Sequence, residues 1–431
     1  MQNVRVTADL HIHSRYSRAT SERMSIEEIG RFARIKGLNL VGTGDFTHPK
    51  WLAEMQETLV PEPDTGLYKI AKNPELPVHF MATTEVSTIF TFAGETKKIH
   101  HVILTPSLEN AAQINDRLSK YGDLASDGRP TLNMDAAHLV EEVMEASSQN
   151  MVFPAHAWTP WFSIFGAFSG FDSVEDCYQD MTKHIYALET GLSSDPPMNW
   201  RLSKLDRFAL VSNSDSHSFW PWRIGREANV FELERPSYFE VVDTIRRKDT
   251  ERFRFTIETD PAYGKYHWTG HRNCHVSLSA KEAIKLGNIC PVCRRKLTKG
   301  VEQRVEELAD RPLGFKPEDA VGFVRLLPLS EIISTVLRVD SPSTQRAWSI
   351  YNSLIERFGN EYAVLIDASK EALVSVADEQ IAEAIVRVRE GNVRIAPGYD
   401  GVYGQIAIFE DQSEEKAGPQ RVRQLNLSDF M

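Results

Sequence analysis

The first 258 residues alternate short apolar or β-branched runs with amphipathic segments. This alternation is typical of a β/α domain built on a parallel sheet. It predicts a helix over 25–36, in which Ser25 and Glu28 form a capping box and Gly37 ends the helix. The predicted strands lie at 4–13, 38–45, 78–85, 99–105, 151–156, 185–189 and 208–215. Seven strands with intervening helices predict a β/α barrel over residues 1–258.

Three further regions follow the predicted barrel. Residues 259–311 are basic and contain three of the four cysteines. Residues 312–410 are predicted to be mostly helical, and a helix predicted over 343–358 ends at Gly359. Residues 411–431 are polar and predict a flexible tail. We therefore expect an α/β protein with a barrel, a small basic module, a helical domain and a tail.

The composition is that of a soluble globular protein of two or three domains, with 431 residues, 42% hydrophobic and 25% charged. The sequence has no apolar run of roughly 18 residues and only four cysteines, so a cytoplasmic protein without a disulfide framework is expected. The net charge of −11 argues against nonspecific coating of nucleic acid. Between positions 264 and 304, however, nine basic residues outnumber two acidic ones, a local net charge of +7.

Nearly every predicted strand carries a metal-ligating side chain at or near one end. The carboxyl ends of barrel strands converge on one face, so side chains that are distant in sequence are expected to meet there. His11 and His13 lie two residues apart on one strand and therefore face the same side. For any single histidine, a hydrogen-bonded barrel residue is the alternative. The set is His11, His13, Asp45, His48, Glu85, His100, His101, His156, Asp215 and His217.

The ligand types indicate which ions the barrel binds. Mixed imidazole and carboxylate ligation favours Zn, Mn or Fe over an oxygen-only Mg or Ca site. The ligands outnumber those that one tetrahedral ion needs, so two or three divalent ions are expected, and activation by Mg stays open. Sites of this kind generate hydroxide at neutral pH and bind both the attacking and the leaving oxygen of a phosphoester. The expected chemistry is hydrolysis, with Asp215 as a ligand and candidate proton acceptor.

A second set of ligands lies in the basic module. The Cys-x-x-Cys spacing at 290–293 is a zinc knuckle, and a His-x-x-Cys pair lies upstream of it. This two-plus-two spacing is typical of a structural zinc site, whose ligands fold a segment too small to fold alone. His267 and His275 are rival fourth ligands, and reduced cysteines in a core are the alternative. The expected set is His271, Cys274, Cys290 and Cys293.

Six motifs over residues 1–254 resemble the polymerase-and-histidinol-phosphatase (PHP) superfamily: ADLHIHSRYS, GTGDFTH, TTEVS, IHHVIL, PAHAW and SNSDSHS. Members are distorted seven-stranded β/α barrels with two or three metals, so the resemblance implies that fold. It implies metal ligation by His11, His13, Asp45, Glu85, His101, His156, Asp215 and His217, with His156, Asp215 and His217 as catalytic residues. Many members have an acidic residue or histidine within 15–19, which this chain lacks. The third metal is therefore open, with His48, His100 and Glu189 as candidate substitutes.

The order of the regions extends the resemblance to nearly the whole chain. The barrel motifs, the zinc segment HRNC…CPVCRRKLTKG and the later APGYDGVYGQI together resemble the endonuclease Q family. Members nick DNA on the 5′ side of a deaminated base, such as uracil, hypoxanthine or xanthine, or of an abasic site. The resemblance implies damaged DNA as the partner, association with the nucleoid when bound, and no membrane. The alternatives are a small-molecule phosphoesterase of the histidinol-phosphatase type and a non-catalytic DNA- or clamp-binding scaffold.

Three sets of residues are candidate DNA contacts. Six aromatic residues after the histidine at 156 are a candidate platform or pocket for an extruded base, or a lid that packs on itself. A tryptophan and two arginines after position 217 are candidates for the scissile phosphate, or lie on a barrel helix. The basic module is a candidate backbone contact, or a solvated face. The residues are Trp158, Trp161, Phe162, Phe165, Phe168 and Phe171; Trp222, Arg223 and Arg226; and Lys265, Arg272, Arg294, Arg295 and Lys296.

Two features of the C-terminal part resemble known binding units. The helical region resembles a degenerate helix-hairpin-helix unit, but Asp378-Glu379-Gln380 stands where such units have glycines, so a structural role is expected. The tail contains Gln424, Leu427 and Phe430, a pattern that resembles the clamp-binding peptides of replication and repair proteins. A tail of this kind is expected to dock in a pocket of the replication sliding clamp.

Overall fold

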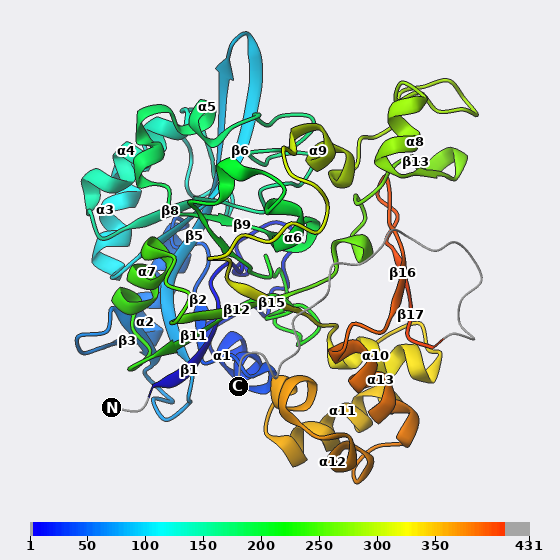
Figure 1. Ribbon diagram of the computed structural model, residues 1–431. Helices are drawn as coiled ribbons and strands as arrows, with labels where there is room; N and C mark the ends of the chain where they lie inside the picture. The colour runs from blue at the N-terminus through cyan, green and yellow to red at the C-terminus, as the bar shows by residue number, and fades with distance from the viewer. Residues whose placement is uncertain (1–2, 410–431) are drawn as a thin grey trace.

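The computed structural model describes residues 3–409, and at its centre lies a ring of β-strands (Figure 1). The strands are β1 (Val4–Asp9), β2 (Leu40–Gly42), β5 (His79–Phe92), β6 (Glu95–Thr105), β8 (Met151–Pro154), β9 (Ala187–Glu189) and β10 (Ala209–Val211). Neighbouring strands pair in that order, with an isolated bridge between Val152 and Ile185 joining β8 to β9. A bridge between Ile12 and Ser216 closes the ring. The predicted β/α barrel is confirmed.

The sheet of the ring is mixed, so the expectation of a parallel sheet is only partly correct. β6 is antiparallel to both β5 and β8, and β5 and β6 form one long hairpin. Ala93 and Gly94 make its turn with φ of 50° and 82°, the backbone geometry that a two-residue hairpin turn requires. β5 therefore continues to Phe92, beyond its predicted end at Glu85, and the Glu85 side chain projects from the middle of a strand.

Three strands outside the predicted set extend the sheet beyond the ring. β11 (Ala228–Leu233) is antiparallel to β1, and β12 (Phe253–Glu258) is antiparallel to β11. β15 (Gly322–Arg325) pairs in parallel with β12, although it lies in the region predicted to be helical. On the other side, the short strands are β3 (Leu59–Glu62), β4 (Leu67–Ile70) and β7 (Thr131–Leu132). The C-terminal part of the chain is thus tied to the barrel sheet.

Helices pack around the outside of the barrel (Figure 1). They are α1 (Ile26–Lys36), α2 (Pro49–Thr58), α3 (Leu108–Leu118), α4 (Ala136–Ala146), α5 (Val174–Tyr178), α6 (Pro196–Asn199) and α7 (Tyr238–Arg247). At the start of α1, the Ser25 side chain accepts the backbone N–H of Glu28, and Gly37 ends the helix in the left-handed conformation. The Glu28 carboxylate pairs with Arg23, so only the Ser25 half of the predicted capping box forms.

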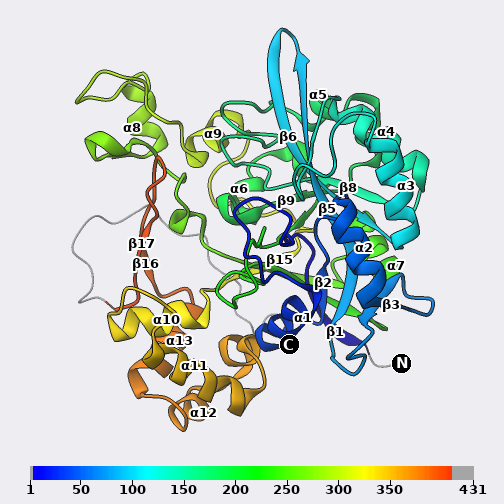
Figure 2. The same ribbon diagram turned by 180° about the vertical axis from the view of Figure 1, so that it is seen from behind.

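The outer part of the basic module projects away from the barrel and has its own small core (Figure 2), whereas its last helix packs against the barrel domain, where Arg304 pairs with Asp172. Its elements are β13 (Thr269–His271), β14 (Val276–Leu278), α8 (Ala280–Lys285) and α9 (Val301–Leu308). The buried core is Val276, Ala283, Cys290 and Leu297. A hairpin of β16 (Arg394–Ala396) and β17 (Gln405–Ala407) reaches the module from the helical domain, where Asp400 accepts the backbone N–H of Arg272 at 2.7 Å.

The helical domain consists of α10 (Leu329–Leu337), α11 (Gln345–Phe358), α12 (Lys370–Val374) and α13 (Glu379–Arg389). The prediction of a helix ending at Gly359 is confirmed, and Thr344 caps its start. A buried ion pair of 2.7 Å between Lys36 Nζ on α1 and Glu361 Oε1 fastens this domain to the barrel. Within residues 3–409, no helix combines the length and apolar character that crossing a membrane needs.

Candidate metal centre

The first candidate metal group lies at one end of the ring, here called the mouth. It consists of His11, His13, Glu85 and Asp215. His13 Nε2 lies 3.0 Å from Asp215 Oδ1 and 3.2 Å from Glu85 Oε2. His11 Nε2 lies 3.5 Å from the same Glu85 oxygen. Asp215 is 32% exposed and the other three side chains are buried, so solvent reaches this group on the Asp215 side.

The second candidate group shares one residue with the first. His100 Nδ1 and His156 Nε2 lie 2.9 Å and 3.1 Å from Glu85 Oε1, and 3.3 Å from each other. All three side chains are buried. Glu85 therefore faces the first group with Oε2 and the second with Oε1, so one carboxylate would supply a ligand atom to an ion in each group.

Two further carboxylates orient the histidines of the first group. Asp45 Oδ1 lies 2.9 Å from His13 Nδ1, and the Glu189 carboxylate lies 3.0 Å from His11 Nδ1. When Nδ1–H donates to a carboxylate, the ring orientation is fixed and the Nε2 lone pair is left for a metal. Asp45 thus supports a ligand from outside both groups, which differs from its predicted role as a direct ligand. Glu189, predicted as a substitute ligand, has the same supporting position.

A buried nitrogen without a partner and the types of donor atom at the mouth both fit a metal ion. In the part of the chain that the structure describes, His11 Nε2 is buried and has no hydrogen-bond partner. Buried polar atoms of this kind are rare unless an ion or water satisfies them. Four imidazole nitrogens and two carboxylates also form the donor set that Zn, Mn or Fe prefers. The residues at the mouth therefore form a site that divalent metals can occupy.

The protonation states of the ligands differ across the site. Although burial opposes protonation, nearby carboxylates raise the pKa of His11, His13 and His156, so a metal ion would have to displace protons from these rings. Burial lowers the pKa of His100 to about 4, so its imidazole is neutral and has a lone pair available. Burial opposes ionisation of Glu85, but neighbouring histidines and Arg129 hold the pKa of its carboxyl well below the ordinary range. Neutral imidazoles and ionised carboxylates are the forms that bind metals, so affinity is expected to fall in acid.

Three residues of the mouth have strained backbones. The φ angles of Asp45, His156 and Asp215 are 50°, 30° and 48°, in the left-handed region that non-glycine residues rarely occupy. Strain of this kind costs on the order of 1–3 kcal/mol per residue and is concentrated at functional sites. The strain lies at two ligands and at the residue that orients a third, which supports a functional role for the mouth.

The structure corrects the choice between the two adjacent histidines of β6. His101 Nε2 lies 2.9 Å from Thr88 Oγ1, and its Nδ1 lies 2.8 Å from the Tyr178 hydroxyl. His101 therefore faces the outer helical layer, since Tyr178 ends α5. Successive residues of a strand point to opposite faces, and His100 is the one that faces the mouth. The prediction of His101 as a ligand is wrong, and His100 takes its place.

The other two histidines predicted near the mouth lie outside both groups. The His217 ring is 4.3 Å from the His13 ring, and its Nδ1–H donates to the Asp215 carbonyl oxygen at 3.0 Å. Burial lowers the pKa of His217, so it is neutral at neutral pH. His48 is buried and stacks on Tyr16 at 4.4 Å, away from the ligand groups. His217 thus contacts a ligand of the first group, whereas His48 belongs to neither group.

Sequence reasoning missed Arg129. Its Nη1 donates to Glu85 Oε2 at 3.0 Å, which makes it a cation in direct contact with the shared carboxylate. Arg129 lies in the loop between α3 and β7, outside every barrel motif. No spacing or composition signal in the sequence marks it, because only the folded loop brings it to the mouth.

The six aromatic residues after His156 separate into two kinds. Trp158, Phe165 and Phe171 are buried in the core, so the prediction that they contact DNA is wrong. Trp161 and Phe168 are 39% and 51% exposed and stack on each other with ring centroids 4.9 Å apart. Phe162 lies between these sets, with its ring 4.8 Å from that of His100. A stacked pair of exposed rings thus lies on the loop that contacts the second metal group.

The three residues after His217 differ in their surroundings. Trp222 stacks on Trp220 at 5.0 Å and meets Trp348 of α11 edge-on at 5.8 Å. It therefore packs between the barrel and the helical domain but is only half-buried, so its contact with DNA stays a prediction. Burial lowers the pKa of Arg226, whose Nη2 lies 3.5 Å from the Ser214 carbonyl oxygen. Arg223 is exposed and stays a candidate phosphate contact.

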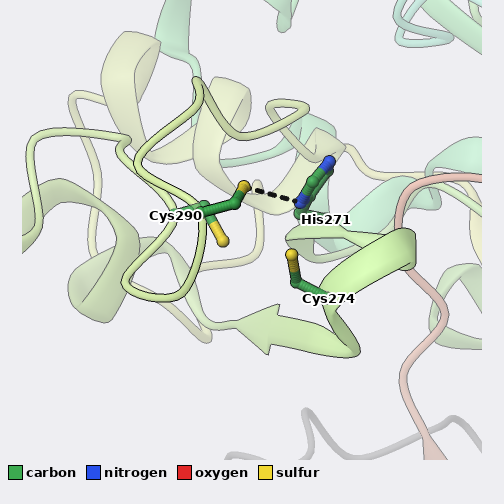
Figure 3. Close-up of side chains that lie close together, drawn as sticks. His271, Cys274 and Cys290 are labelled. Atoms are coloured by element: carbon green, nitrogen blue, oxygen red, sulfur yellow. Dashed lines mark hydrogen bonds between the residues drawn. The ribbon is translucent and has the colours of Figure 1, made fainter.

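The four predicted zinc ligands come together in the basic module. Ligand atoms of His271, Cys274, Cys290 and Cys293 all lie within 4.8 Å of one another, and Figure 3 shows three of them converging. Backbone N–H groups of Cys293 and Val292 lower the pKa of Cys290 to about 6, which favours the thiolate that zinc binds. The rivals His267 and His275 are not part of this group.

The five basic residues of the module that are predicted to contact DNA are all exposed. They are Lys265, Arg272, Arg294, Arg295 and Lys296.

Comparison with known proteins identifies the family. The MJ0043 C-terminal domain family matches residues 328–392. The crystal structure of the lesion-specific endonuclease PfuEndoQ from Pyrococcus furiosus covers 96% of this chain and 98% of its own, at 35% identity and a TM-score of 0.84. The chain belongs to the endonuclease Q family. A second endonuclease Q structure, in complex with a 27-mer duplex substrate with an abasic lesion at the active site, matches at 35% identity with a TM-score of 0.82 and covers 95% and 98% of the two chains.

A curated relative is longer than this chain. MJ0043 of Methanocaldococcus jannaschii is 33% identical over 265 residues, which are 60% of this chain and 32% of MJ0043. The chain thus spans about a third of that relative's length. The endonuclease Q structures nevertheless match the barrel, the module and the helical domain together, because they cover 96% and 95% of this chain. This match over nearly the whole chain favours an endonuclease over the alternatives of a small-molecule phosphoesterase and a non-catalytic scaffold.

Proposed function

We propose that this protein hydrolyses the phosphodiester on the 5′ side of a deaminated base or an abasic site in DNA. The observation that carries the proposal is the Glu85 carboxylate, which two ligand groups share at the mouth of the barrel. In addition, nearly the whole chain is similar to the endonuclease Q structure. The complex of the relative with abasic duplex DNA supports an abasic site as one substrate. Uracil, hypoxanthine and xanthine are the deaminated bases that we expect.

We further propose two barrel ions, of Zn, Mn or Fe, and one structural zinc in the module. When bound, the barrel ions supply positive charge that activates water and stabilises the leaving oxygen. Glu85, His100 and His156 would hold one ion, and the same glutamate would hold the other with His11, His13 and Asp215. Burial lowers the pKa of His217, and its Nδ1–H donates to the Asp215 carbonyl oxygen. The Nε2 of this neutral ring therefore has a lone pair that would take up the proton released by the attacking water.

We propose that DNA lies across the mouth and the basic module. The Trp161 ring lies 5.3 Å from that of Tyr266, and Lys265 lies over the Tyr266 ring at 5.4 Å. The stacked pair of Trp161 and Phe168 therefore continues into the module, where exposed lysines and arginines suit a phosphate backbone. Stacked aromatic rings next to a catalytic centre are typical platforms for an unpaired base.

Replacing Trp161 or Phe168 with alanine is expected to weaken binding of abasic duplex by about 5- to 150-fold, because loss of one stacking ring costs about 1–3 kcal/mol. The measurement is fluorescence anisotropy with an abasic duplex in the presence of Ca²⁺, which is not expected to support cleavage. Phe239→Ala is the control, since Phe239 is 41% exposed on α7. Equal binding by all three variants would show that the stacked pair does not contact DNA.

A panel of single-lesion duplexes tests the proposed function. End-labelled strands with one deoxyuridine, deoxyinosine, deoxyxanthosine or abasic site are incubated with the protein and Mn²⁺ or Mg²⁺, beside an undamaged duplex. We expect one product per lesion, cut on its 5′ side, and no cut in the undamaged strand. Equal cutting of damaged and undamaged DNA would contradict lesion specificity, and cutting on the 3′ side would contradict the assigned bond.

We also propose that the tail binds the replication sliding clamp. Gln424, Leu427 and Phe430 lie outside the residues that the structure describes, so the proposal rests on the sequence pattern alone. Deleting residues 424–431 is expected to abolish clamp binding in surface plasmon resonance and to leave nicking of free DNA unchanged. Undiminished clamp binding by the shortened chain would show that the tail is not the docking segment.

A further inference from the structure

Arg129 places a positive charge at an acidic and imidazole-rich mouth. Its Nη1 lies 3.0 Å from Glu85 Oε2, the oxygen that belongs to the first metal group. The side chain is 29% exposed, so part of the guanidinium is open to a substrate. A guanidinium has five N–H donors, and the bond to Glu85 uses one of its two amino groups.

The loop that carries Arg129 is fastened on both sides of it. The Gly128 N–H donates to the Tyr16 carbonyl at 3.0 Å, and the Ser87 N–H donates to the Pro130 carbonyl at 2.9 Å. Gly128 also packs against the site itself, because a Cβ there would lie 2.3 Å from both Asp45 Oδ2 and Ser17 Oγ. The backbone is therefore held against the metal-supporting residues, and this fixes where the Arg129 side chain emerges.

Neutralising Glu85 does not require Arg129. The two Glu85 oxygens lie within 3.5 Å of ring nitrogens of His11, His13, His100 and His156, and the divalent ions that these residues would hold would supply the counter-charge of the carboxylate. The group at this mouth that does need a counter-charge is the phosphate of a DNA substrate. A guanidinium matches phosphate oxygens through parallel N–H donors better than any other side chain.

We propose that Arg129 is a catalytic residue that donates hydrogen bonds to a non-bridging oxygen of the scissile phosphate. The proposal rests on the proposed function for the identity of the substrate. Arg129 transfers no proton in this role: the bonds that form and break are those of phosphodiester hydrolysis, and the guanidinium stabilises the extra negative charge on the phosphoryl oxygens as water adds.

The test combines cleavage with phosphate binding by the metal-loaded, full-length protein. Arg129→Ala is expected to lower the single-turnover cleavage rate about 10²-fold, as loss of one oxyanion donor does, and to weaken binding of inorganic phosphate about tenfold in isothermal titration calorimetry. Metal content by mass spectrometry is expected to stay unchanged. Added guanidinium ion is expected to restore part of the cleavage rate, and Arg129→Lys to retain more of it than alanine does.

Arg117→Ala is the matched control. Arg117 is 31% exposed on α3 and pairs with Glu142 and Glu145, far from both ligand groups, so phosphate affinity and cleavage should not change. Loss of barrel metal in Arg129→Ala, or unchanged phosphate affinity, overturns the proposal. If the wild-type protein fails to nick DNA yet loses phosphate affinity in Arg129→Ala, the proposed substrate is wrong and the phosphate contact stands.

Discussion

Glu85→Gln is expected to lower nicking of an abasic duplex by about 10³-fold or more. Loss of a group that merely orients a ligand already costs about 10- to 100-fold in metal affinity or activity, and Glu85 belongs to both ligand groups. Glutamine keeps the size of the side chain but has one neutral oxygen and one amide donor in place of the two anionic oxygens facing the groups. Both barrel ions are therefore expected to bind more weakly.

The measurement for Glu85→Gln is the single-turnover cleavage rate together with the metal content of the purified protein. His101→Gln is the matched control, because His101 is fully buried on the neighbouring strand and faces away from both groups. We expect the folded His101→Gln protein to keep its barrel metals and its activity. Full metal content in Glu85→Gln, or metal loss in His101→Gln, would contradict the assigned ligand set.

Cys290→Ser is expected to remove the structural zinc and unfold the basic module. The core of this module is only four buried residues, which is too small to hold about 40 residues without a metal. Structural zinc contributes about 10–16 kcal/mol of binding free energy in small zinc-dependent units, so its loss exceeds what that core can offset. Binding of undamaged duplex is expected to weaken as well, because the exposed basic residues lose their fixed positions.

Zinc content and limited proteolysis within 265–300 measure this effect. Cys177→Ala is the control, since Cys177 is buried in the barrel domain and is the one cysteine outside the zinc group. We expect Cys177→Ala to keep the zinc and the resistance of the module to protease. A Cys290→Ser protein that retains its zinc and an intact module would show that another ligand set holds the metal.

The strand segments of the barrel could be predicted because each is a short stretch rich in apolar or β-branched residues. Which of the two adjacent histidines of β6 points to the mouth could not be predicted, because His100 and His101 are flanked by the apolar residues Ile99 and Val102. Either histidine could then point inward with an apolar neighbour beside it. The contacts of His101 with Thr88 and Tyr178 decide the orientation, and those residues come from other elements.

The distinction between ligands and supporting residues also depends on the fold. Asp45 and Asp215 both follow short strands and look alike in sequence, yet Asp45 lies on the Nδ1 side of His13 and Asp215 on the Nε2 side. For the same reason, aromatic spacing could not separate the buried Trp158 from the exposed Trp161. Arg129 lay beyond prediction because a loop with no motif carries it to Glu85.

The central claim is that two barrel ions at a shared carboxylate drive a single lesion-directed cut. Its most direct test is titration of metal-free protein, with its structural zinc retained, by Mn²⁺ while cleavage of an end-labelled abasic duplex is followed. We predict that cutting on the 5′ side of the lesion rises to a maximum near two ions per chain and stays absent from undamaged DNA. A maximum at one ion, or no cutting of the abasic strand at any Mn²⁺ concentration, would contradict the account.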